Sequence, residues 1–166
     1  NTYSETGASN TLAFKRGEKL EYRVHYGLIN AGTAAIEISE KTTSYNNREV
    51  LHAIGTGKSN SFFDFFFKVR DRYESIFDQN SLKPIKFVRQ VNEGGYKIEQ
   101  DYVFDPEKDI VDNGKGNKYK LPYTNVQDMI SAFYYVRSFD FTKATIGDVY
   151  DIPTFLDNEV YHMKMK

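Results

Sequence analysis

Alternation of apolar and polar side chains constrains the fold of this chain more than any other feature. Between Lys19 and Tyr26, four polar residues alternate with the apolar residues Leu20, Tyr22, Val24 and Tyr26. A period of two predicts a β-strand with one buried and one solvent-facing side. The pattern recurs, and we predict further strands over residues 34–39, 49–57, 72–78, 84–91, 96–104, 149–156 and 159–166.

Turn residues separate the predicted strands. Asn46-Asn47 and Asp157-Asn158 tolerate positive φ, and Asn92-Glu93-Gly94-Gly95 is a strong hairpin signal. Short connections of this kind join antiparallel strands. We therefore expect a mainly β fold, a curved antiparallel sheet or open barrel of roughly eight to ten strands.

One long amphipathic helix is predicted over residues 124–138. Thr124 and Gln127 have the spacing of a capping box, and apolar residues then follow helical spacing through Val126, Met129, Ile130 and Phe133. We expect this helix to pack on the concave face of the sheet, with those four side chains buried. Residues 62–69 could form a second, short helix capped by Ser61, or instead a buried strand.

The chain length of 166 residues fits one domain. We divide it into a flexible N-terminal segment, residues 1–13, and a single β-rich domain, residues 14–166. Polar segments like residues 1–12 commonly follow a removed signal peptide, although a cloning or cropping artefact would look the same. Because the sequence ends within a strand pattern, we expect the domain to be C-terminally incomplete, with more chain or a partner strand covering residues 161–165.

Charge and cysteine content exclude several classes of function. Twenty-two basic and 23 acidic residues give a net charge of −1, without the basic stripe of a nucleic-acid-binding protein. No cysteine is present, which excludes a disulfide scaffold, a cysteine-zinc site and a thiol nucleophile. No apolar run has the length of a membrane span.

A glycine-rich stretch, Gly55-Thr56-Gly57-Lys58-Ser59, partly matches a phosphate-binding loop. The full motif requires a glycine at position 52, where the chain has His52. The surrounding pattern also predicts antiparallel strands, whereas a phosphate loop leads from a strand into a helix of a parallel α/β sheet. We expect the stretch to lie on or beside a strand, with no nucleotide bound and no helix N-terminus facing it.

No constellation for catalysis or metal binding emerges from the sequence. His25, His52 and His162 lie far apart without ligand spacing, and no G-x-S-x-G motif is present. Acidic residues between Asp64 and Asp78 could include a general acid, but no pair stands out. We therefore expect no catalytic, metal or cofactor-binding residues, and no enzyme.

The densest apolar feature is the phenylalanine run at residues 62–67, which includes Phe66. We predict that this run and the long helix together form an apolar binding surface around a dry pocket of about a few hundred Å³. A role in the core is the simpler alternative. The candidate residues are Phe62, Phe63, Phe65, Phe66, Phe67, Met129, Phe133 and Tyr134.

Several stretches resemble the bacterial family called domain of unknown function 3108. The stretches are residues 14–22, 30–32, 69–75, 82–84, 103–105 and 128–135, and the resemblance spans about residues 14–150. It implies an exported protein of the Gram-negative periplasm or outer envelope, without known catalytic residues. By analogy, the predicted fold resembles the open barrels of periplasmic lipoprotein carriers.

Taken with the phenylalanine run, this resemblance leads to two functional expectations. The first is a non-enzymatic module that binds a lipid, another apolar ligand or an envelope protein partner. The alternative is a structural or assembly factor of the cell envelope that has no small-molecule ligand.

Overall fold

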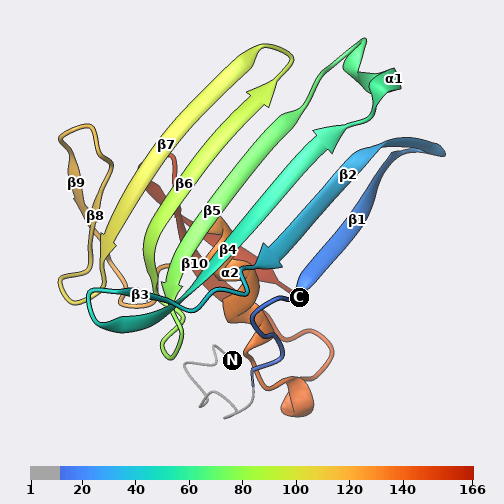
Figure 1. Ribbon diagram of the computed structural model, residues 1–166. Coiled ribbons are helices and arrows are strands. Elements are labelled where there is room, and N and C mark those ends of the chain that lie inside the picture. Colours follow the sequence, from blue (N-terminus) through green and yellow to red (C-terminus); the bar gives the residue numbers. More distant parts are fainter. Residues whose placement is uncertain (1–11) are drawn as a thin grey trace.

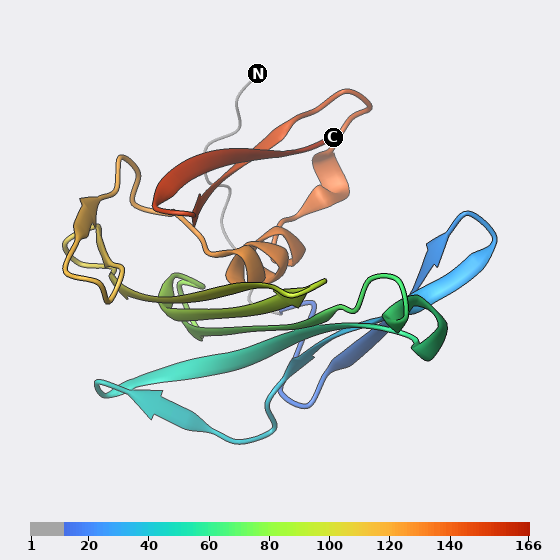
Figure 2. The same ribbon diagram turned by 90° about the horizontal axis from the view of Figure 1, so that it is seen from above.

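The computed structural model describes residues 12–166, which form a large curved sheet covered on one face by a helix and a hairpin (Figures 1 and 2). The strands are β1 (Lys19–Tyr26), β2 (Ile29–Ile38), β3 (Thr43–Tyr45), β4 (Arg48–Ser59), β5 (Arg70–Asp78), β6 (Pro84–Glu93), β7 (Tyr96–Asp105), β8 (Ile110–Asp112), β9 (Lys118–Lys120), β10 (Tyr150–Leu156) and β11 (Glu159–Met165). The helices are α1 (Ser61–Asp64), α2 (Met129–Arg137) and the 3₁₀ turn η1 (Phe141–Lys143).

The main sheet has nine strands and is entirely antiparallel. Its order is β1-β2-β4-β5-β6-β7-β8-β9, with β3 paired to the end of β4. A separate hairpin consists of β10 and β11. The sheet does not close on itself, so the predicted mainly β, antiparallel and open architecture is confirmed.

The predicted turns are confirmed by their backbone angles. Asn46-Asn47 and Asp157-Asn158 all have positive φ between 50° and 66°, and Gly94-Gly95 has φ of 55° and 92°. These are the angles that two-residue hairpin turns require, which explains the Asn and Gly residues at these positions.

Helix α2 is shorter than predicted and begins at a different residue. Its N-cap is Asp128, which forms the capping box with Ser131, so the predicted pair Thr124 and Gln127 was wrong. Gln127 cannot start a helix because its backbone bridges to Thr154 of β10 in an extended conformation. Of the four side chains expected to be buried, Val126 and Ile130 are buried, whereas Met129 and Phe133 are half-buried.

Helix α2 and the β10–β11 hairpin lie on the same face of the main sheet, which we call the covered face (Figure 2). Helix α2 approaches β4 closely at Gly55, where an added β-carbon would lie 2.9 Å from Cδ1 of Ile130 and would displace the end of that side chain. The turn of the hairpin is fixed by Asp157, which accepts hydrogen bonds from Arg89 and Gln100. The opposite side of the sheet is the open face.

The covering elements leave part of the sheet uncovered. In β1, Leu20 is half-buried, but Tyr22, Val24 and Tyr26 are exposed, so the prediction of one buried face was wrong beyond Leu20. The reason is that α2 packs against β4, β5 and β10, not against this edge strand. Most of the proposed flexible segment, residues 1–13, lies outside the described residues.

Three short strands and one helix length were not foreseen. Strands β3, β8 and β9 have three residues each, too few for alternation to be recognised. The helix predicted over 62–69 is only the single turn α1, and its N-cap is Asn60, not Ser61. The side chain of Asn60 accepts a hydrogen bond from the Phe63 amide at 3.0 Å, which fixes the start of the turn.

Candidate binding surface

Three loops project beyond the strands at one end of the main sheet (Figure 1). Large exposed apolar residues lie in and beside these loops. We call these residues the aromatic end. They come from the β1–β2 turn, from α1 and the segment after it, and from the start of β7. The members, all exposed, are Tyr26, Leu28, Ile29, Phe62, Phe65, Phe66, Phe67 and Tyr96.

The most exposed members are Leu28 at 100%, Phe65 at 87% and Tyr26 at 77%, followed by Phe66 at 70%. The phenylalanines contact one another rather than the core: the ring of Phe66 lies 5.3 Å from that of Phe65 and 5.6 Å from that of Phe62. Single exposed apolar residues are ordinary, whereas large exposed apolar patches are typical of interaction sites.

Backbone hydrogen bonds hold the three loops together. The amide of Asn60 donates to the carbonyl of Ala31 at 3.0 Å, which fixes α1 beside the β1–β2 turn. The amide of Gly94 donates to the carbonyl of Lys68 at 2.8 Å, which fixes the β6–β7 turn beside the segment after α1. The aromatic end therefore brings together, on three neighbouring loops, residues that are distant in sequence.

A polar staple inside the loop between β4 and β5 keeps the phenylalanines outside. Arg70 binds both carboxylate oxygens of Asp64, and the hydroxyl of Ser59 donates to the same carboxylate. The hydrogen bonds from Arg70 and then Ser59 lower the pKa of Asp64. The loop thus ties the Asp64 carboxylate to the ends of β4 and β5, while the rings of Phe62, Phe65, Phe66 and Phe67 face solvent.

The structure separates the two groups of predicted site residues. Phe62, Phe65, Phe66 and Phe67 lie at the aromatic end, with Phe63 half-buried behind them. Met129, Phe133 and Tyr134 belong to α2, which lies over Gly55, five residues before α1 is capped by Asn60. At about 3.3 Å per strand residue, Gly55 and Asn60 are roughly 17 Å apart along the chain, so α2 packs well before the end of β4 that leads into the phenylalanines.

The α2 residues of the predicted site contribute to the core. Tyr134 is fully buried, and its ring packs against those of Phe14, Phe77 and Phe133. Burial raises the pKa of Tyr134, and within residues 12–166 its hydroxyl has no hydrogen-bond partner. Of the predicted site residues, only members of the phenylalanine run therefore belong to the aromatic end.

One ionisable group lies in the core at the start of α2. The carboxyl of Asp128 is fully buried, accepts hydrogen bonds from the hydroxyl of Ser75 and from the amides of Ile130 and Ser131, and its pKa is raised by burial to about 6. Sequence reasoning missed this residue, because an aspartate before a helix normally caps it in solvent.

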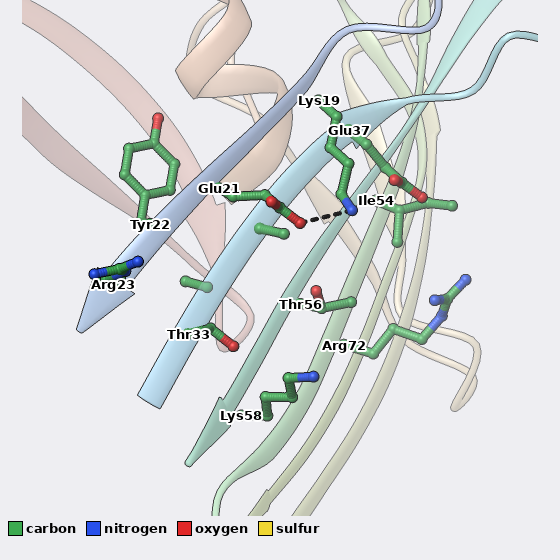
Figure 3. Close-up of a pocket in the computed structure, with 12 residues that line it drawn as sticks. Lys19, Glu21, Tyr22, Arg23, Thr33, Glu37, Ile54, Thr56, Lys58 and Arg72 are labelled. Carbon is green, nitrogen blue, oxygen red and sulfur yellow. Dashed lines mark ion pairs between the residues drawn. The ribbon is translucent and has the colours of Figure 1, made fainter. Parts of the chain in front are cut away.

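The open face carries a hollow of about 600 Å³ over β1, β2, β4 and β5 (Figure 3). Half of its twelve lining residues are charged, with Lys19, Arg23, Lys58 and Arg72 beside two glutamates. Lys19 forms an ion pair with one of them, Glu21, at 2.7 Å. Alternation explains why sequence reasoning missed the hollow: Lys19, Glu21 and Arg23 appeared as ordinary solvent-facing positions of the first strand.

The other sequence candidates are placed as follows. Gly57, Lys58 and Ser59 end strand β4, as predicted, although the single turn α1 follows them directly. His25 and His162 are exposed, whereas His52 is half-buried and contacts Glu74 at 2.8 Å. Across residues 12–166, no group of three or more potential ligands has the arrangement of a metal site.

The candidate acids all have local partners. Asp64 binds Arg70, Asp71 accepts from the Asn92 amide, and Glu74 binds Arg72. Asp78 accepts hydrogen bonds from the amides of the turn that follows it.

No helix in the described part of the chain is long and apolar enough to cross a membrane.

Comparison with known proteins gives one match. The family model described as "Protein of unknown function (DUF3108)" matches residues 21–166. No curated protein and no solved structure matches the chain.

Proposed function

Because the chain belongs to the DUF3108 family, described as proteins of unknown function, we propose a function from the exposed aromatic end. The protein is a non-enzymatic module that binds an apolar partner through this end. The observation that carries the proposal is the exposed cluster of Phe62, Phe65 and Phe66 beside the fully exposed Leu28. We include in the proposal that the protein is exported and works in the Gram-negative envelope, where a chain without cysteine avoids wrong disulfide pairing.

Stability alone gives no reason for this surface. Burying one such side chain contributes about 1.5–3 kcal/mol, and the fold forgoes this contribution at several neighbouring positions. At the same time, the Ser59–Asp64–Arg70 staple uses three polar side chains to hold the loop in this conformation. A binding surface that must be present before its partner arrives accounts for both features.

The test is binding to neutral dodecyl maltoside micelles, measured by sedimentation. The double variant Leu28→Ser/Phe65→Ser should lose most of the micelle binding, because it removes two apolar side chains of the aromatic end. The fold should be preserved, because both side chains are exposed and lie outside the core. The matched control is Ile146→Ser, which removes an equally exposed apolar side chain from a loop outside the aromatic end. Equal binding by all three proteins would refute the proposal.

A further inference from the structure

The register of the main sheet places cations directly behind the aromatic end. Arg23 of β1 pairs with Thr33 of β2, which pairs with Lys58 of β4, which pairs with Arg70 of β5. These four residues form one row across the open face, and Figure 3 shows Arg23, Thr33 and Lys58 on that face. It is the row nearest α1, because β4 ends at Ser59.

Two cations of this row have no carboxylate partner. Arg70 is paired with Asp64, but within residues 12–166 no carboxylate forms an ion pair with Arg23 or Lys58. Lys68, exposed in the loop after α1, adds a third such cation. The chain as a whole has a net charge of −1, so this local excess of positive charge is specific to the region.

Glu21 lines the same hollow on the open face but is paired with Lys19. Two other acidic residues near this end lie on the other side. Asp71 pairs with Gly57 and Glu93 follows Val91 by two, so both belong to the covered face. Burial and then the neighbouring Asp71 raise the pKa of Glu93. A negatively charged surface that meets the open face and the aromatic end would therefore encounter cations and not these carboxylates.

We propose that the aromatic end docks on the surface of an anionic lipid bilayer, with the phenylalanines and Leu28 in the interface and Arg23, Lys58 and Lys68 near the headgroup phosphates. This inference rests on the proposed function and names the partner. Apolar side chains bordered by Lys and Arg are the chemistry that binds anionic membrane surfaces. The three loops project from the sheet, a shape that a deformable lipid surface accommodates without a matching cavity.

The experiment is flotation with vesicles of phosphatidylcholine alone and of an equimolar mixture with phosphatidylglycerol. The unmodified chain should bind the anionic vesicles at least about tenfold more tightly, and high salt should weaken this binding. The variant Arg23→Gln/Lys58→Gln should lose about tenfold or more toward anionic vesicles while keeping its binding to neutral micelles. The matched control, Lys115→Gln/Lys143→Gln, removes two exposed lysines elsewhere and should bind more tightly than the Arg23/Lys58 variant.

The outcomes separate this inference from the proposed function. Equal binding to both vesicle types, or equal losses in the two charge variants, would overturn the lipid inference and leave the apolar surface in place. Micelle binding without any vesicle binding would also overturn it, in favour of a protein partner. If the Leu28→Ser/Phe65→Ser variant bound neutral micelles as well as the unmodified chain, the proposed function itself would be overturned.

Discussion

The hydroxyl of Ser75 on β5 donates to the buried carboxyl of Asp128 at a distance of 2.6 Å. The second carboxyl oxygen accepts the amides of Ile130 and Ser131, both at 2.8 Å. One side chain therefore joins the start of α2 to the centre of the sheet. Because Gln127 also bridges to Thr154 of β10, this point fixes the helix, the hairpin and the sheet relative to one another.

The buried Asp128 predicts a specific pH dependence of stability. Its pKa is raised from 3.8 to about 6 in the folded protein. The folded state therefore binds the proton more tightly, and this stabilisation is full below pH 3.8 and lost as the pH rises through about 6. In urea unfolding, the contribution of Asp128 to the unfolding free energy should fall by about 3 kcal/mol across this pH range.

The variant Asp128→Asn isolates this contribution. Asparagine keeps the oxygen that caps Ile130 and Ser131, and its amide can donate to the Ser75 hydroxyl. The difference in unfolding free energy between variant and unmodified protein should move in favour of the variant as the pH rises from 4 to 6. A difference that is constant with pH would contradict the assigned environment of Asp128.

Arg137 at the end of α2 predicts a second stabilising contact. It forms an ion pair with Glu18 at 2.5 Å and lies 5.3–5.7 Å from the ring centres of Phe14, Phe133 and Tyr134. Arg137→Ala should lower the unfolding free energy by about 2 kcal/mol, because it leaves a partly buried Glu18 unpaired. Arg137→Lys should recover only part of this, since an ammonium lacks the planar pair of nitrogens that binds the two carboxylate oxygens of Glu18. Thermal unfolding of the two variants checks the order.

Gly32 predicts a strong difference between two glycines of the sheet. A β-carbon at Gly32 would lie 2.3 Å from the carbonyl oxygen of Lys58, whereas at Gly57 the nearest atom is the β-carbon of Asp71 at 3.8 Å. Gly32→Ala should therefore cost about 1–3 kcal/mol by forcing β2 away from β4. Gly57→Ala should be tolerated within about 0.5 kcal/mol, as measured by urea unfolding. Similar losses in both variants would argue against the close approach at Gly32.

Local patterns predicted the strands better than they predicted burial. The bounds of β1 follow directly from the alternation between Lys19 and Tyr26, and three turns follow from residues that accept positive φ. Whether Tyr22 is buried depends instead on where α2 and the β10–β11 hairpin pack. Those elements lie more than a hundred residues later in the chain, and no local period records their position.

The candidate surface was predicted in part. The phenylalanine run was identified from the sequence. Its distance from α2 was not, because that distance depends on β4 continuing for several residues beyond Gly55. The contribution of Leu28 depends on the hydrogen bond between Asn60 and Ala31, and the cation row depends on the register of four strands. Both are pairings between distant residues, which propensity and periodicity do not encode.

The central claim, that the aromatic end enters an apolar phase, is tested most directly by tryptophan fluorescence. The chain contains no tryptophan, so Phe66→Trp places a single reporter at the aromatic end. Tyr161→Trp places the same reporter at an exposed position on β11 as a control. On addition of neutral dodecyl maltoside micelles, the emission of the Phe66→Trp protein should shift to shorter wavelength while that of the control stays unchanged. An unchanged spectrum at position 66, or an equal shift at both positions, would contradict the account.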